Sequence, residues 1–153
     1  MLKHGMRLYC IATDDNHNFE LRPNTTTHTS DSCGGWTMIK APELSYSAVI
    51  DAFDAGHFYC SNGPEIYAYY IEDDKLCVDC SPVRGVHLRS DRISGAGRLV
   101  QEGDMIAHAE FELEPLRQKG HRYVRLELVD THRAAAYTNP YYLSECGTGG
   151  VAK

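Results

Sequence analysis

The chain has 153 residues, of which 42% are apolar and 24% are charged. These values are typical of one globular domain, or of one domain with part of another, and they argue against a disordered chain. The net charge of −6 and the lack of any Lys/Arg run argue against nucleic-acid binding. The opening stretch "MLKHGMRLYC" lacks the apolar length of a signal peptide or membrane span, so we expect a cytoplasmic protein without membrane contact.

The six cysteines are expected to be thiols, because disulfide frameworks are rare in the cytoplasm. Only Cys77 and Cys80 are close together in the sequence, and a zinc ribbon needs a second such pair. Their flanks, "KLCVDCSPV", predict a strand, on which side chains three positions apart point to opposite faces. We therefore expect ordinary buried thiols here, and a redox or zinc protein is a weaker hypothesis.

The first third of the chain predicts two strands and one helix. Residues 6–12, "MRLYCIA", form a short apolar run that predicts a buried strand, and "WTMIK" at 36–40 predicts another after a long polar segment. The sequence "LSYSAVIDAFDAGHF" predicts a helix with Ser45 as its N-cap and Gly56 just after its end. A short strand and a turn follow in "FYCSNGPEI".

From Ile66 onward the apolar pattern has a period of two. "IYAYYIEDDKLCVDC" predicts a hairpin that turns at residues 72–74, and "IAHAEFEL" and "HRYVRLELVD" predict strands with one buried face. Phe111, Val124, Leu126 and Leu128 are expected to point inward. The sequence thus predicts an antiparallel, β-sandwich-like unit, with a boundary near Gly63–Pro64.

The segment "IATDDNHNF" combines two aspartates with a histidine. If the strand continued extended through Asp15 and His17, both side chains would project to one side and could bind a divalent cation. Asp14 would then point the other way and could fix the strand end or support a ligand. The alternative is an Asx-type turn with an incidental histidine.

Several blocks together resemble the C-terminal part of PHP-domain (polymerase and histidinol phosphatase) proteins, in particular their metal-dependent phosphoesterase subgroup. These blocks are "LYCIATDDNHN", "SDSCGGWTMIKAPELS", "AFDAGHFYCSNGPEI", "CSPV" and "YVRLELVDTHRAAAYTNPYYL", and they span nearly the whole chain. PHP domains are distorted (β/α)7 barrels that bind up to three metal ions. The last metal motif of the family, D-x-H, corresponds to Asp15 and His17.

The resemblance implies an α+β, β-rich chain with three parts: residues 1–64 as the terminal strand and helix piece of the barrel, residues 65–146 as an antiparallel β accessory domain, and residues 147–153 as a tail. It implies Zn, Mn or Fe as cofactor and a phosphorylated small molecule as substrate. The family's first motif, H-x-H, is absent from this chain, so a longer polypeptide, a partner or a homo-oligomer would have to complete the site. His28 and Asp31 are further candidate ligands.

The resemblance predicts hydrolysis of a phosphate ester by metal-activated water. Since a catalytic zinc site commonly has three protein ligands and a D-x-H motif supplies two, we expect the chain to be incomplete as an enzyme by itself. The alternative hypothesis is a non-catalytic β-sandwich module, for binding or assembly, that retains a vestigial metal motif. The truncated barrel edge is also expected to expose apolar surface around residues 6–12 and at Val49, Ile50 and Phe53, which would promote association.

Overall fold

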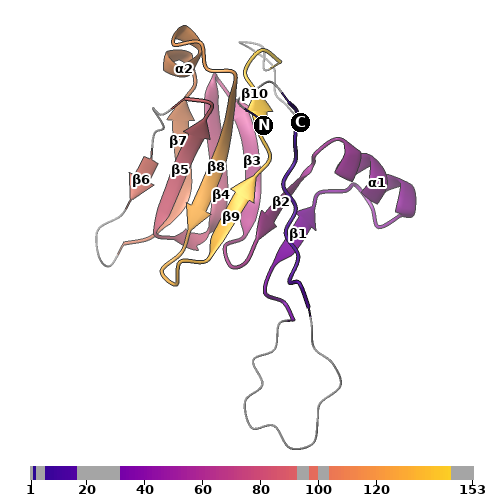
Figure 1. The fold of residues 1–153 in the computed structure, drawn as a ribbon. Helices are drawn as coiled ribbons and strands as arrows, with labels where there is room; N and C mark the ends of the chain where they lie inside the picture. Colours follow the sequence, from indigo (N-terminus) through magenta and orange to yellow (C-terminus); the bar gives the residue numbers. More distant parts are fainter. Residues whose placement is uncertain (1, 3–5, 17–31, 93–96, 100–103, 146–153) are drawn as a thin grey trace, which may run out of the picture.

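The computed structural model describes residues 2, 6–16, 32–92, 97–99 and 104–145, which form two antiparallel β-sheets and two short helices (Figure 1). The larger sheet has the strand order β1-β2-β9-β8-β5-β6, with β10 paired to β8, and the smaller sheet has the order β3-β4-β7. The large sheet consists of β1 (Trp36–Ile39), β2 (Phe58–Ser61), β5 (Gly85–Ser90), β6 (Gly97–Leu99), β8 (Tyr123–Val129), β9 (Ala135–Thr138) and β10 (Tyr141–Tyr142). The small sheet consists of β3 (Ile66–Glu72), β4 (Lys75–Val83) and β7 (Ile106–Glu112), and the helices are α1 (Tyr46–Asp54) and α2 (Glu114–Gln118).

The main core lies between the two sheets, as expected for a β-sandwich. Leu76 and Val78 of β4 face the core from one side, and Leu126 and Leu128 of β8 face it from the other. All residues of this cluster fall between Ile71 and Leu143. The predicted alternation is confirmed, because the four inward residues named from the sequence are buried: Phe111, Val124, Leu126 and Leu128.

The hairpin between β3 and β4 turns where the sequence predicts. Glu72 pairs with Lys75, and the two residues between them, Asp73 and Asp74, have φ values of 47° and 58°. Two consecutive left-handed residues are the conformation of a type I′ turn, whose twist matches that of the flanking strands. On β4, Cys80 belongs to the core while Cys77 lies on the opposite face, so the two thiols diverge as predicted.

The helix α1 also begins and ends as predicted. The Ser45 hydroxyl accepts a hydrogen bond from the Ala48 N–H at 3.3 Å, and Gly56, just beyond the C-cap, has a φ of +75°. The helix packs beside β1 and β2, outside the main core (Figure 1). There the Phe53 and Phe58 rings stack with centroids 4.8 Å apart.

The N-terminal segment and the helix α2 differ from the sequence predictions. Residues 6–12 do not form a buried strand: no strand is assigned within 6–16, and Met6, Leu8 and Ile11 are exposed. The helix α2 was not predicted, since its five residues, Glu114–Gln118, are too few to show a helical period.

The predicted boundary near residue 64 does not interrupt the large sheet. Strand β2 precedes the boundary and β9 follows it, yet the two pair, with Cys60 opposite Tyr137. The fold is therefore β-rich with two antiparallel sheets and few helices, and the two predicted parts share one sheet. Within the described residues, neither helix has the length and apolar character needed to cross a membrane.

Candidate functional site

The segment that carries Asp14 and Asp15 runs beside β1 and is held there by side chains rather than by a β ladder (Figure 1). The Ala12 N–H donates to the Thr37 hydroxyl at 3.1 Å, and the same hydroxyl donates to the Ala12 carbonyl at 3.0 Å. The Thr37 side chain thus satisfies both backbone groups of one residue, which replaces a strand partner at that point.

Further along the chain, a buried asparagine fixes the start of this segment. The Asn139 side-chain oxygen accepts from the Cys10 N–H at 3.1 Å, and its amide group donates to the Gly56 and Phe58 carbonyls at 3.0 and 3.1 Å. Asn139 therefore joins the segment, the end of α1 and strand β2. The sequence analysis did not identify this role of Asn139.

The backbone turns at Asp15, which changes the geometry expected from the sequence. Asp15 has a φ of 50°, so the chain is not extended through Asp15, and the condition on which the alternation argument depended does not hold at this residue. Asp14 accepts a hydrogen bond from the Cys33 N–H at 2.9 Å, which ties the segment to the turn at residues 32–35. The remaining candidate ligands, His17, His28 and Asp31, lie outside the described residues.

A polar cavity of about 300 Å³ opens beside this segment. The two backbone segments at Thr13 and Gly35 lie close together. Position 35 requires glycine, because a Cβ there would lie 2.9 Å from the Thr13 carbonyl oxygen. Four separate parts of the sequence line the cavity. The lining residues include Ala12, Thr13, Gly35, Ser61, Asn62 and Arg133. Two of the lining residues, Ala12 and Thr13, directly precede Asp14 and Asp15 in the sequence.

The polar side chains around the cavity differ in the hydrogen bonds and ion pairs that they form. The buried Ser61 hydroxyl donates to the Pro64 carbonyl at 2.6 Å, and the Asn62 side-chain oxygen accepts from the Ala135 N–H at 2.7 Å. The Ser61 side chain thus stabilises the turn after β2, as the sequence suggested, and the Asn62 side chain ties this turn to the start of β9. Arg133 differs, since its side chain is exposed and forms no ion pair with any described residue. Among the residues that line the cavity, Arg133 is the one with a basic side chain.

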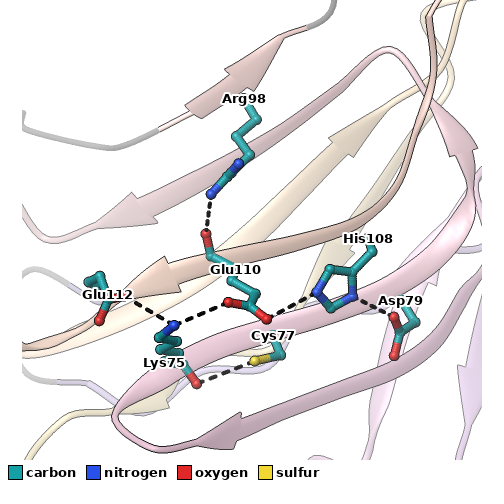
Figure 2. A network of polar contacts seen from close by, with 7 residues as sticks. All are labelled: Lys75, Cys77, Asp79, Arg98, His108, Glu110 and Glu112. Carbon is teal, nitrogen blue, oxygen red and sulfur yellow. Dashed lines mark hydrogen bonds and ion pairs between the residues drawn. The ribbon is translucent and has the colours of Figure 1, made fainter.

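A second polar cluster lies on the outer face of the small sheet (Figure 2). The His108 ring lies between two carboxylates, with Nδ1 2.7 Å from Asp79 Oδ1 and Nε2 3.3 Å from Glu110 Oε1. Lys75 Nζ lies 3.3 Å from Glu110 and 3.4 Å from Glu112. The hydrogen bonds to Asp79 and then Glu110 raise the pKa of His108, and those from His108 and Lys75 lower the pKa of Glu110.

This cluster is an ion-pair network rather than a metal site. Both ring nitrogens of His108 already face carboxylates, so neither has a lone pair directed at a shared cation. In the part of the chain that the structure describes, no group of three or more His, Cys, Asp or Glu side chains is arranged to hold a metal ion. Of the residues predicted for the metal site, Asp14 and Asp15 are the two that fall among the described residues.

No family model, curated protein or solved structure matches this chain.

Proposed function

We propose that this chain is the C-terminal portion of a PHP-type metal-dependent phosphoesterase, incomplete as an enzyme by itself. In this proposal Asp15 and His17 contribute to a divalent metal site, and the polar cavity beside them receives a phosphorylated small molecule. Residues 1–64 would be the end of the barrel, and residues 65–146 an accessory β domain that packs on it.

The observation that carries the proposal is the composition of the polar cavity. Its lining comes from four of the blocks in which the sequence resembles PHP proteins: Thr13 from "IATDDNHN", Gly35 from "SCGGW", Asn62 from "YCSNGP" and Arg133 from "THRAAAYTNP". These residues are far apart in the sequence, and they meet beside the two aspartates. Convergence of separate segments is what a shared binding site requires.

The chemistry of the cavity suits a phosphate ester. The exposed Arg133 guanidinium can donate two parallel hydrogen bonds to phosphate oxygens. The Asp15 carboxylate is a ligand type that divalent cations accept, and the imidazole of His17 is another. When bound, metal ions would supply a water of lowered pKa as nucleophile.

The donor set within this chain does not complete such a site. The sequence has no H-x-H motif, and the described residues contain no group of three ligands. Two protein ligands leave most coordination positions to water, so we expect weak metal binding and little hydrolysis by the isolated chain. The missing ligands would have to come from another segment, a partner or a second copy.

A paramagnetic titration tests where a cation binds. Manganese(II) added to the ¹⁵N-labelled chain should broaden amide signals next to the cavity, at residues 12–15, 34–35 and 61–62. Asp15→Asn and His17→Ala should each abolish this local broadening. His132→Ala is the matched control, because His132 is exposed on the turn beside Arg133 and should leave the broadening unchanged. Broadening centred on Asp79 and Glu110 instead would overturn the assignment.

An activity assay then separates the two hypotheses. The isolated chain should hydrolyse p-nitrophenyl phosphate barely above background, and any metal affinity should decrease below pH ~6.5 as His17 becomes protonated. If metal is bound stoichiometrically and lost in both variants, the ligands are correct and the chain or its oligomer completes the site. Robust turnover that neither substitution affects would refute the proposal, and a total lack of cation binding would favour the non-catalytic module.

A further inference from the structure

Two cysteines from distant parts of the chain lie beside one another. The Cys60 thiol of β2 donates a hydrogen bond to the Cys10 sulfur, and the two Sγ atoms are 3.5 Å apart. A covalent disulfide has a sulfur–sulfur distance of about 2.05 Å, so closing the bond requires an approach of roughly 1.5 Å. A change of that size is within the reach of side-chain rotation.

The backbone on both sides holds the thiols in this arrangement. Cys10 is fixed through its N–H to Asn139, and the adjacent Tyr9 ring packs edge-on against Phe58 with centroids 5.9 Å apart. Cys60 lies in the middle of β2, paired with Thr37 on one side and Tyr137 on the other. The two thiols are therefore held next to each other by the fold.

The two thiols differ in their environments. Cys10 is exposed and lines a cavity of about 570 Å³ together with Tyr9, Arg125 and Asn139, so a small solute can reach its sulfur. Cys60 is only 2% exposed, and burial together with the hydrogen bond to Cys10 raises the pKa of its thiol to about 12. The sulfur that reacts first with a solute is therefore that of Cys10, and Cys60 is placed to react second.

We propose that Cys10 and Cys60 are a modification site, at which a hydroperoxide converts the thiol pair into a reversible disulfide. With hydrogen peroxide, the Cys10 sulfur attacks one oxygen, the O–O bond breaks, and the leaving hydroxide takes the Cys10 proton, so that a sulfenic acid and one molecule of water result. The Cys60 sulfur then attacks the Cys10 sulfur, the S–O bond breaks, and the released hydroxide takes the Cys60 proton to give a second water. The two sulfurs together lose two electrons and the peroxide gains two, and a dithiol reductant reverses the bond.

The bond would tie the N-terminal segment to the large sheet. Residues 6–16 contact the sheet mainly through side-chain hydrogen bonds such as that between Ala12 and Thr37, and through Asn139. A covalent link at Cys10 would restrict opening of the segment just before Asp14 and Asp15. The oxidation state of the pair would thereby control how firmly the candidate cation site is held, but the disulfide itself does not depend on that function.

Mass spectrometry of the whole chain tests the proposal. Treatment with a small excess of hydrogen peroxide, followed by alkylation, should give a species with two fewer alkyl groups and a non-reducing digest in which the peptides of Cys10 and Cys60 are linked. Dithiothreitol should restore full alkylation. Oxidation should also slow hydrogen exchange at residues 11–16 at least several-fold.

Three variants keep this test falsifiable. Cys10→Ser removes an exposed thiol without touching the core and should abolish the linked peptide, while Cys60→Ser should leave Cys10 as a sulfenic acid that dimedone traps. Cys33→Ser removes the other thiol that is exposed among the described residues and should leave the link intact. The proposal would be overturned by a link from Cys10 to Cys33 or by a link that forms only between two chains. It would also be overturned if Cys10 and Cys60 were still unmodified after the peroxide had been consumed.

Discussion

Phe111→Ala measures whether the face of β7 is assigned correctly. Phe111 is 6% exposed, lies opposite Leu76 on β4 and belongs to the core between the sheets. Truncation removes most of a buried aromatic ring and leaves a cavity, because the two sheets are held apart by their other side chains. Changes of this type cost about 3–5 kcal/mol. With a urea m-value of about 2 kcal/mol/M, the midpoint of unfolding should fall by roughly 1.5–2.5 M.

The assay is urea unfolding followed by far-UV circular dichroism, with Glu112→Ala as the matched control on the same strand. Glu112 points to solvent, and its carboxylate lies 3.4 Å from Lys75 Nζ across an exposed face. An exposed ion pair of this kind contributes less than about 1 kcal/mol, so the control should shift the midpoint little. A loss below roughly 1 kcal/mol for Phe111→Ala, or a larger loss for the control, would refute the assignment of the buried face.

Two further predictions concern His108 and association. Because Asp79 and Glu110 raise the pKa of His108, an NMR titration of its ring should have a midpoint above 6.5, and Asp79→Asn should lower it. Because the His108 pKa is higher in the folded state, protonation of His108 stabilises the fold below pH about 6.5, its pKa in the unfolded state. This stabilisation is lost as the pH rises through the pKa of the folded state. Since His108 is about half exposed, it should add less than ~1 kcal/mol to the free energy of unfolding. A midpoint that Asp79→Asn leaves unchanged would contradict the geometry. The exposed apolar side chains within residues 6–12 and at Ile50 and Phe53 should also make the chain associate, and light scattering at micromolar concentration should give a mass above that of one chain, reduced by Ile50→Glu. A single-chain mass for the wild type would count against this.

The sequence predicted the features that depend on neighbouring residues. The period-two pattern identified the buried faces of β7 and β8, because alternation is a property of each strand alone. Ser45 and Gly56 bounded α1, since capping needs only local backbone groups. The prediction of a buried strand at residues 6–12 was wrong, because a short apolar run does not distinguish a buried strand from an exposed segment.

Only the tertiary structure decided which distant segments meet. The pairing of β2 with β9 and the position of Asn139 bring residues 10–16 beside the large sheet, and no periodic pattern encodes either contact. The polar cavity at Arg133 and the thiol pair of Cys10 and Cys60 both result from that arrangement. Local patterns determine which face of a strand is apolar, whereas the choice of partner depends on the free energy of burying all those faces together, which is a property of the whole chain.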